Sequence, residues 1–401
     1  MATTAAPNRT FTERIHRIEP SATLMMMQAA ATLRAQGVHL VDLGAGEPHF
    51  TTPAHVKEAG IRAITNNETK YMPVAGIPEL RRAIAERHAA DWGSDFGPEE
   101  TIFTPGGKFA LFLALQTLVE EGDEVIVPVP YWVSFKDMVA YTGATPVLVE
   151  TREEDGFRLT ARSLESAITP RTRAMIINSP NNPTGAVLPA TDYEEIVMLA
   201  HERGIYVIAD ECYVYLNYAD ERDRISAGKF RRAKEHVVVV GSLSKTYAMT
   251  GWRCGFALAD HTVVQQMAKL QSQSASSISA IGQKAAIAAL TGAQDCIATM
   301  RAAYVKLRDR CISGLRAIPG ITCTSPEGAF YAYPNVSSVM GRNGIQNTLD
   351  LCDRLLREAH VVTNAGDTFG TSHHIRLSYA VAPDVLEEAL RRLGSWFSEH
   401  K

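Results

Sequence analysis

Short apolar runs alternate with amphipathic stretches along most of the chain, which predicts strands alternating with helices. We expect strands at residues 101–104, 124–127, 145–149, 174–178, 205–209 and 236–240. The stretches between them include 108–119 and 192–203, whose apolar residues recur at helical spacing. Continuously apolar strands separated by helices are typical of an α/β fold with a mostly parallel sheet covered on both faces.

The pattern changes after about residue 290. Three long helical patterns cover 293–315, 346–359 and 382–397, and short strands such as 375–378 stand between them. This change predicts a second, smaller α+β domain.

Composition excludes several classes of protein. The 401 residues are 46% hydrophobic and 21% charged, with a formal net charge of -4, so the chain is neither disordered nor strongly basic. The densest basic stretch, 229–234, is interpreted as a solvated face rather than a nucleic-acid site. Six scattered cysteines without a C-x-x-C motif indicate reduced thiols, and no apolar run reaches the roughly 18 residues of a membrane span. We therefore expect a soluble, cytoplasmic protein.

Ligands of parallel sheets bind beyond the carboxyl ends of the strands, so the residues after each run are candidates for chemistry. Gly106, Gly107 and Lys108 follow the first strand and open a helix, where free amide groups favour an anion such as phosphate. Taken alone, such a Gly pair before a helix is more often simply a turn. Asn182 lies in the segment Ser-Pro-Asn-Asn-Pro-Thr-Gly after the fourth strand, which is also compatible with a simple tight turn.

The next two strand ends carry ionisable residues. Asp210 ends a very apolar strand and would need either a cationic partner or a helix-capping role, and Tyr213 follows three residues later. Lys245 follows the sixth strand in a segment that also holds Ser242 and Arg253. A desolvated lysine there would have a lowered pKa and could serve as a nucleophile or base. Ser242 to Lys245 also matches the S-x-x-K motif of penicillin-recognising enzymes, but the S-D-N and K-T-G partners are missing.

Together these segments resemble the class I/II aminotransferases, which are fold type I enzymes dependent on pyridoxal 5′-phosphate. The resemblance is closest to the bacterial aspartate aminotransferases. It rests on segments in the family's order: LGAGEPHF (43–50), TKYMPVAGIPELR (69–81), TPGGK (104–108), PYW (130–132), NSPNNPTG (178–185), ADECY (209–213), SLSKTYAMTGWRCG (242–255) and IRLSYA (375–380). It implies an arm at 1–22, a large cofactor-binding domain at 51–290, and a small domain formed by 23–50 and 291–401.

The resemblance also implies a role for each matching residue. Lys245 would bond covalently to the cofactor, Asp210 would pair with its pyridine nitrogen, and Tyr213 and Asn182 would bind its 3-oxygen. Trp132 would stack on the ring, and the phosphate would be held by Gly106, Gly107, Lys108, Ser242 and Arg253, with Tyr71 reaching it from the other subunit of a homodimer. Arg376, with Gly46 and Asn182, would bind the α-carboxylate of the substrate.

One segment departs from the family pattern. Many bacterial members have K-P-S-x-T in the N-terminal arm, with the lysine serving the distal carboxylate of the substrate, whereas this chain has Glu19-Pro20-Ser21-Ala22-Thr23. If Glu19 faced the substrate it would repel a dicarboxylic amino acid, and a cation such as Arg17 would have to compensate. Alternatively, Glu19 points into solvent.

Three hypotheses about function follow. The first is an aminotransferase that moves an amino group between an amino acid and a 2-oxo acid, and the second is a β-lyase that uses the same cofactor and residues. The third is a cofactor-binding transcription regulator. Regulators of that kind carry a DNA-binding winged helix ahead of the matching region, where only about twenty residues stand here, so we expect an enzyme without a nucleic-acid partner.

Overall fold

The computed structural model describes residues 11–20, 22–219 and 223–400. Residues 1–10 and Ser21 of the predicted arm therefore lie outside the described residues. The helices are α1 (Glu13–His16), α2 (Ala22–Ala35), α3 (Ala54–Thr65), α4 (Pro78–Trp92), α5 (Gly107–Leu118), α6 (Ser134–Thr142), α7 (Ala161–Glu165), α8 (Ala190–Glu202), α9 (Leu243–Thr246), α10 (His261–Ser274), α11 (Ala280–Thr291), α12 (Asp295–Arg316), α13 (Thr348–Arg354) and α14 (Pro383–Glu399). The strands are β1 (Val41–Asp42), β2 (Thr101–Thr104), β3 (Glu124–Val129), β4 (Thr145–Glu150), β5 (Thr172–Asn178), β6 (Tyr206–Asp210), β7 (Val237–Ser242), β8 (Gly255–Leu258), β9 (Tyr331–Ala332), β10 (Val361–Val362), β11 (Asn364–Ala365) and β12 (Ile375–Ser378).

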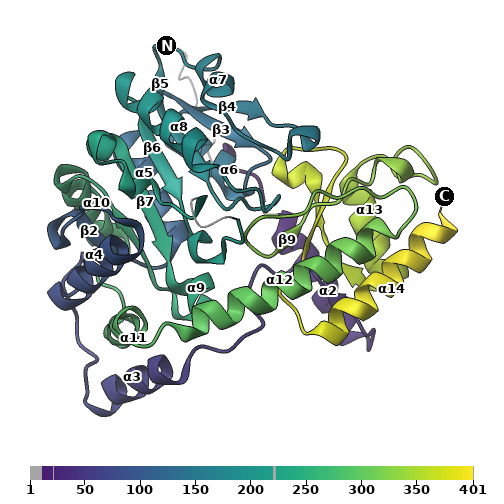
Figure 1. Ribbon diagram of the computed structural model, residues 1–401, viewed down its shortest axis with the longest axis horizontal. Coiled ribbons are helices and arrows are strands. Elements are labelled where there is room, and N and C mark those ends of the chain that lie inside the picture. The colour runs from purple at the N-terminus through teal and green to yellow at the C-terminus, as the bar shows by residue number, and fades with distance from the viewer. Residues whose placement is uncertain (1–10, 21, 220–222, 401) are drawn as a thin grey trace, which may run out of the picture.

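A seven-stranded sheet in the order β2-β8-β7-β6-β5-β3-β4 forms the centre of the larger part of the molecule (Figure 1). The six predicted strands are present, and the pairs β3–β4, β3–β5, β5–β6 and β6–β7 are parallel, which confirms the predicted α/β class. The antiparallel β8 was not predicted, and it lies between β2 and β7. A glycine is needed where β8 begins, because a Cβ on Gly255 would lie 2.3 Å from the Gly106 carbonyl carbon.

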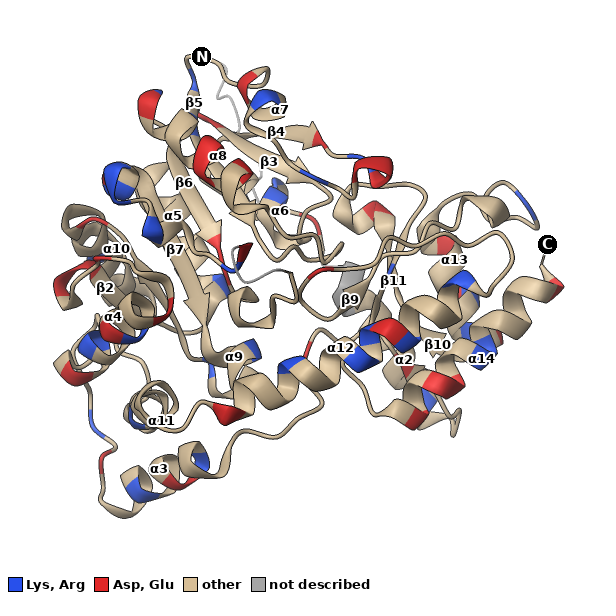
Figure 2. Cartoon of the chain, viewed as in Figure 1, with Lys and Arg blue, Asp and Glu red and all other residues tan. Residues whose placement is uncertain are grey.

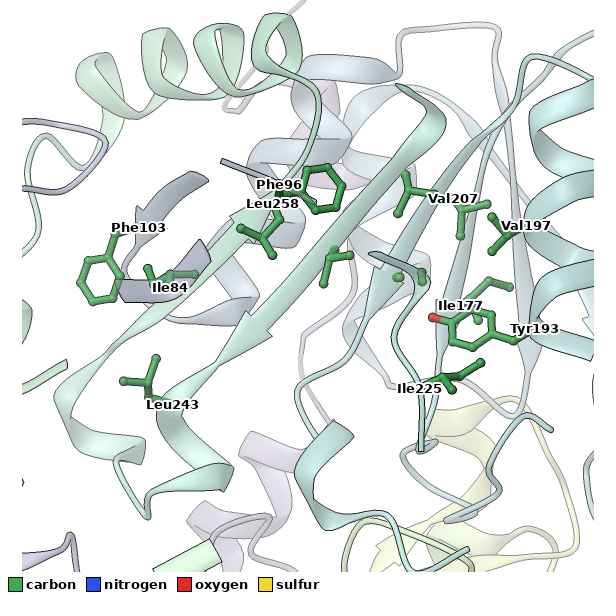
Figure 3. Packing of buried hydrophobic residues seen from close by; sticks show 14 of the residues in the cluster. Ile84, Phe96, Phe103, Ile177, Tyr193, Val197, Val207, Ile225, Leu243 and Leu258 are labelled. Carbon is green, nitrogen blue, oxygen red and sulfur yellow. The ribbon is translucent and has the colours of Figure 1, made fainter. Parts of the chain in front are cut away.

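Helices cover both faces of this sheet, which explains why its central strands are apolar throughout. All six residues of β7 are buried. On one face, Ile177 and Val207 of the sheet pack with Tyr193 and Val197 of α8 in one hydrophobic cluster (Figure 3). On the other face, α5 and α10 contribute Leu111, Leu115 and Met267 to a second cluster.

The smaller part of the molecule has its own hydrophobic cluster around the three-stranded antiparallel sheet β11-β12-β9. Helix α14 packs its apolar face there, with Leu386, Leu390, Leu393 and Phe397 at helical spacing. The long α12 runs from the larger part to the smaller part and contacts α14 (Figure 1). The helix predicted at 346–359 is shorter, because α13 ends at Arg354 and a π-helical turn (Leu355–Ala359) follows.

Charged residues of both signs alternate along the outer helices. Figure 2 shows lysine and arginine interspersed with aspartate and glutamate on α12 and α14. In the basic stretch 229–234, Lys234 forms an ion pair with Glu100 at 2.9 Å. None of the described helices combines the length and the apolar composition that a bilayer-spanning segment needs.

Candidate active site

The carboxyl ends of β5, β6 and β7 open into a cavity of about 560 Å³ between the large sheet and the smaller part of the molecule. Most of the predicted site residues line this cavity, although they come from distant segments. They are Gly46, Gly107, Lys108, Trp132, Asn182, Asp210, Tyr213, Ser242, Lys245, Arg253 and Arg376. Parallel strands bring their carboxyl ends to one edge, which explains why residues from segments 100 and more positions apart meet here.

Lys245 lies in the short helix α9, directly after β7. Its ammonium group donates a hydrogen bond to the Gly46 carbonyl and lies 5.9 Å from the centre of the Phe330 ring. Burial lowers the pKa of Lys245 to about 8, and the nearby Arg376 and Arg253 act in the same direction. An amine with this pKa is partly unprotonated near neutral pH and can act as a nucleophile or a base.

Asp210 is the last residue of β6 and is buried. The backbone N–H of Cys212 donates to Asp210 Oδ1 at 3.1 Å, and no cation among the described residues forms an ion pair with this carboxylate. Desolvation raises the pKa of Asp210. A buried carboxylate that faces a cavity without a cationic partner is suited to a protonated nitrogen of a ligand.

Arg376 is the most deeply buried cation of the cavity, with 5% of its surface exposed. It lies in β12, where it pairs across the strand with Asn364 of β11. Its guanidinium donates to Asn182 Oδ1 at 2.9 Å and to the Gly44 carbonyl at 3.0 Å, and it lies 4.5 Å from the centre of the Tyr331 ring. Its Nε has no hydrogen-bond partner in the structure. A buried guanidinium with an unused donor and no carboxylate partner among the described residues is suited to a ligand carboxylate.

Tyr213 joins the same network from the sheet side. Its hydroxyl lies 2.7 Å from that of Tyr331, and desolvation raises its pKa well above the ordinary value. Tyr331 also explains why residue 46 is a glycine, because a Cβ there would lie 2.6 Å from the Tyr331 hydroxyl. Burial raises the pKa of Tyr331 as well, so both phenols stay protonated. One hydroxyl donates to the other, and the accepting hydroxyl keeps its proton for an acceptor in the cavity.

The glycine pair and Arg253 form one corner of the cavity. A Cβ on Gly106 would lie 2.6 Å from Arg253 Nη2, so only a glycine leaves room for this guanidinium beside the start of α5. Gly106 also has φ +89°, which favours glycine. Ser242 accepts a hydrogen bond from the Ser244 amide at 3.1 Å and lines the same cavity. Free helix amides, a hydroxyl and a guanidinium are the groups that bind phosphate.

Trp132 and Lys108 lie together at the wall of the cavity. The Lys108 ammonium group lies 4.7 Å from the centre of the Trp132 ring, and burial lowers its pKa, with the charge of Arg253 acting in the same direction. Lys108 therefore contributes two groups: its ammonium group lies at the cavity, and its backbone N–H belongs to the first turn of α5.

Four residues discussed from sequence lie outside the residues that line the cavity. Gly106 contacts Arg253 and leaves room for its guanidinium, as described above. Tyr71, in the loop between α3 and α4, is 93% exposed. Glu19 is exposed, and Arg17 forms a 3.8 Å ion pair with Glu121.

The cavity also contains residues that sequence reasoning missed. They include Glu47, Asn178, Cys212, Tyr331 and Asn364. Asn178 and Cys212 flank predicted residues at the same strand ends, so the rule that pointed to Asp210 applied to them as well. Tyr331 belongs to the short β9, and no local signal in the sequence marks it.

Comparisons with known proteins agree with this arrangement. Residues 38–393 match the family model described as aminotransferase class I and II, so the chain belongs to the class I and II aminotransferases. Like other members of this family, it is a transferase that depends on pyridoxal 5′-phosphate and acts on amino acids and 2-oxo acids. This confirms the first of the three hypotheses, the aminotransferase.

Individual relatives are similar over nearly their whole length. The chain is 44% identical to an aspartate/prephenate aminotransferase of Thermus thermophilus, a match that covers 96% of this chain and 98% of the relative. It is 40% identical to an aspartate aminotransferase of Geobacillus stearothermophilus, with 95% and 97% covered. Among solved structures, the T. thermophilus aspartate aminotransferase with maleate superposes with a TM-score of 0.91 at 43% identity, covering 96% of this chain and 99% of that chain. The aspartate aminotransferase of Rhizobium meliloti gives 0.93 at 38% identity, covering 98% and 100%.

The groups present in the cavity fit pyridoxal phosphate. The cofactor carries an aldehyde, a phosphate, a pyridine nitrogen and a 3-oxygen. The cavity offers a desolvated amine, an anion-binding helix start with Arg253, a buried carboxylate, and the hydroxyl of Tyr213. The unused Nε of Arg376 then leaves a place for the carboxylate of a substrate.

Proposed function

We propose that the protein transfers the amino group of aspartate, or of a closely similar dicarboxylic amino acid, to a 2-oxo acid. The observation that carries this proposal is the set of four cations that line the cavity among the described residues: Lys108, Lys245, Arg253 and Arg376. Cofactor attachment, the phosphate and one substrate carboxylate account for three of them. The fourth, Lys108, is left for a second carboxylate.

For the cofactor, we assign Lys245 to covalent attachment, Asp210 to the pyridine nitrogen, and Tyr213 and Asn182 to the 3-oxygen. Trp132 would pack against the ring, and the phosphate would be held by Gly106, Gly107, Ser242, Arg253 and the backbone N–H of Lys108. When bound, the cofactor supplies an electron sink that makes the Cα–H bond of the amino acid acidic. Asp210 supports this role because its charge keeps the pyridine nitrogen protonated.

Lys245 carries the proton. With cofactor and substrate bound, the Lys245 amine would be the base that takes the proton from Cα of the amino acid and holds it for return. With a pKa of about 8, the Lys245 amine can both accept and release a proton near neutral pH, because the two steps have similar free-energy costs.

Arg376 orients the substrate. Two of its N–H groups are held by Asn182 and Gly44, which fixes the plane of the guanidinium, and its remaining donors bind the α-carboxylate. This contact is common to all amino acids, so it positions the Cα–H bond without selecting the side chain.

Lys108 selects the side chain in this proposal. Lys108 as a whole is exposed, but its ammonium group lies against Trp132 and burial lowers its pKa, so an ion pair with a second carboxylate is stronger there than in open water. The relatives named above act on aspartate, and one solved relative is described with maleate, a small dicarboxylate. Both facts support a dicarboxylic substrate for this chain.

The test is the substrate profile of Lys108→Met. We expect kcat/KM for aspartate to fall about tenfold or more while that for alanine, which lacks the second carboxylate, stays nearly unchanged. Lys136→Met is the matched control, since it removes the same charge from an exposed position on α6. An equal loss for aspartate and alanine, with weaker cofactor binding, would instead assign the Lys108 side chain to the phosphate.

We further propose that the protein is a cytoplasmic homodimer without nucleic-acid or membrane partners. The exposed Tyr71 supports this, because its side chain is available to complete the phosphate site of a neighbouring subunit. Sedimentation should then give about twice the 43.8 kDa of the chain. The arm at 1–22, the large domain at 51–290 and the small domain at 23–50 and 291–401 remain our proposed division, with the small domain closing over bound substrate.

A further inference from the structure

A group of potential metal ligands lies at the opposite end of the sheet from the cofactor cavity. His201 belongs to the last turn of α8, and Glu235 and His236 end a 3-10 segment (Arg231–His236) directly before β7. Since β7 ends at Ser242 in the cavity and a strand rises about 3.3 Å per residue, roughly 20 Å separate the two places. None of the roles proposed above involves these three residues.

The three side chains converge on one point. The Nδ1 atoms of His201 and His236 are 3.1 Å apart, and Glu235 Oε1 lies 3.8 Å from one and 3.9 Å from the other. Three atoms at these separations lie about 2.1 Å from a common centre, which is the distance from zinc to a histidine nitrogen or a carboxylate oxygen. The geometry is therefore close to that of three ligands around one small cation.

The two imidazoles face each other directly, and a neighbouring ring holds one of them in place. A neutral imidazole offers a free nitrogen to a metal, whereas two nitrogens 3.1 Å apart without one must share a proton. The Tyr206 ring packs edge-on against His236 at 5.5 Å and limits its rotation.

The charges around the group partly balance one another. Glu235 contributes a negative charge, and the carboxyl end of α8 contributes the negative end of a helix dipole. Arg173 of β5 opposes a cation, but its guanidinium is turned over the Tyr206 ring, 5.3 Å from its centre, and its Nε donates to the Leu118 carbonyl. A ligand set of one carboxylate and two imidazoles gives a divalent ion one negatively charged ligand.

We propose that His201, Glu235 and His236 bind one divalent transition-metal ion of the zinc class, with water as a fourth ligand. Imidazole with carboxylate is a ligand set that zinc accepts and magnesium does not prefer. The ion would join the end of α8 to the start of β7, two segments 35 residues apart in the chain. Its effect would be on stability, because the cofactor cavity is far away.

The experiment uses metal-free holoenzyme titrated with zinc by calorimetry, and with cobalt(II) followed by its visible absorption. We expect one saturable site, bands typical of a tetrahedral ion, no binding of magnesium, and a melting temperature that rises with zinc. His201→Ala should weaken zinc binding about tenfold or more and abolish the rise in melting temperature. Glu235→Gln, at an exposed position, should weaken binding less and keep the fold.

His261→Ala is the matched control, because it removes an exposed histidine elsewhere on the surface and should leave zinc binding unchanged. The variants should keep the kcat of the unmodified enzyme in metal-free buffer, which shows that they are folded. The absence of a saturable zinc site in the unmodified protein would overturn the proposal. Zinc affinity that is unchanged in both His201→Ala and Glu235→Gln would overturn it equally.

Discussion

Asp210 and Glu211 are adjacent buried carboxyls at the end of β6, yet they belong to two different environments. Asp210 lines the cofactor cavity and has no cationic partner among the described residues. Glu211 accepts hydrogen bonds from the Tyr193 hydroxyl at 3.0 Å and from the Ala227 amide at 2.7 Å, within the protein interior. Beyond it, Ser226 and His88 continue the interior network at 3.2 Å.

The hydrogen bonding of the two carboxyls distinguishes groups that are available to bind a ligand from groups that stabilise the folded chain. On the cavity side, Lys245, Asp210 and Arg376 keep unused hydrogen-bonding capacity at a cost in desolvation. On the interior side, Glu211 Oε1 is bonded by other parts of the chain, as in ordinary buried networks, whereas Glu211 Oε2 is buried without a hydrogen-bond partner. Substitutions on the first side should therefore alter catalysis, and those on the second should alter stability.

The largest effect on the cavity side is expected for Lys245→Ala. Turnover should fall by about 10⁴-fold or more, because both the covalent attachment and the proton carrier are lost. Cofactor should still bind through the phosphate groups. Borohydride reduction of the unmodified holoenzyme and peptide mapping should place the label on Lys245, and Lys269→Ala, at an exposed position, should be labelled and active as before. A label on another lysine would refute this assignment.

Arg376→Ala should have the next largest effect. Removing one member of a buried charge pair costs roughly 2–5 kcal/mol in substrate binding and orientation, so kcat/KM should fall for every amino donor alike. Arg376→Lys keeps the charge but loses the fork of two donors, and should recover only part of the loss. Steady-state kinetics with aspartate, glutamate and alanine checks this, and a loss confined to aspartate would contradict the α-carboxylate role.

Glu211→Gln tests the interior side. Burial raises the pKa of Glu211 to about 7 from its ordinary 4.5, so the folded protein keeps this proton to a higher pH than the unfolded chain does. The contribution of Glu211 to the free energy of unfolding is therefore fully present below about pH 4.5. About 3 kcal/mol of it is lost as the pH rises through about 7.

Glutamine does not titrate, so Glu211→Gln should remove this decline. The stability of the Glu211→Gln variant relative to the unmodified protein should increase as the pH rises through this range, while its kcat at neutral pH stays close to normal. Burial lowers the pKa of His88 to about 4, so its effect on the pH dependence of stability is opposite to that of Glu211. Because both proteins contain His88, its effect cancels in the difference between their stabilities. Melting temperatures of both holoenzymes across the range provide the measurement, and parallel curves would contradict the prediction.

These two environments also show what could be predicted from sequence. Asp210, Lys245 and Ser242 follow continuous apolar strands, so their place at the edge of the sheet follows from chain order alone. Sequence does not reveal that Glu211, one position later, turns to the interior, because its partners Tyr193 and Ala227 meet it only in the folded state. The same holds for the Tyr213–Tyr331 pair, 118 residues apart, and for β8, whose antiparallel pairing leaves no mark on its four residues.

The smallest effect is expected outside both environments, at Glu19. Its side chain is exposed and does not line the cavity, and its backbone N–H hydrogen-bonds to Asp137 of α6, a contact that any residue can make. An exposed charge contributes little, so Glu19→Lys should leave the ratio of kcat/KM for aspartate over alanine unchanged within about twofold. Lys108→Met, measured beside it, should change the same ratio about tenfold. A selective rise for aspartate in Glu19→Lys would instead mean that the arm reaches the substrate during turnover. The missing lysine of the K-P-S-x-T pattern would then be a determinant of specificity.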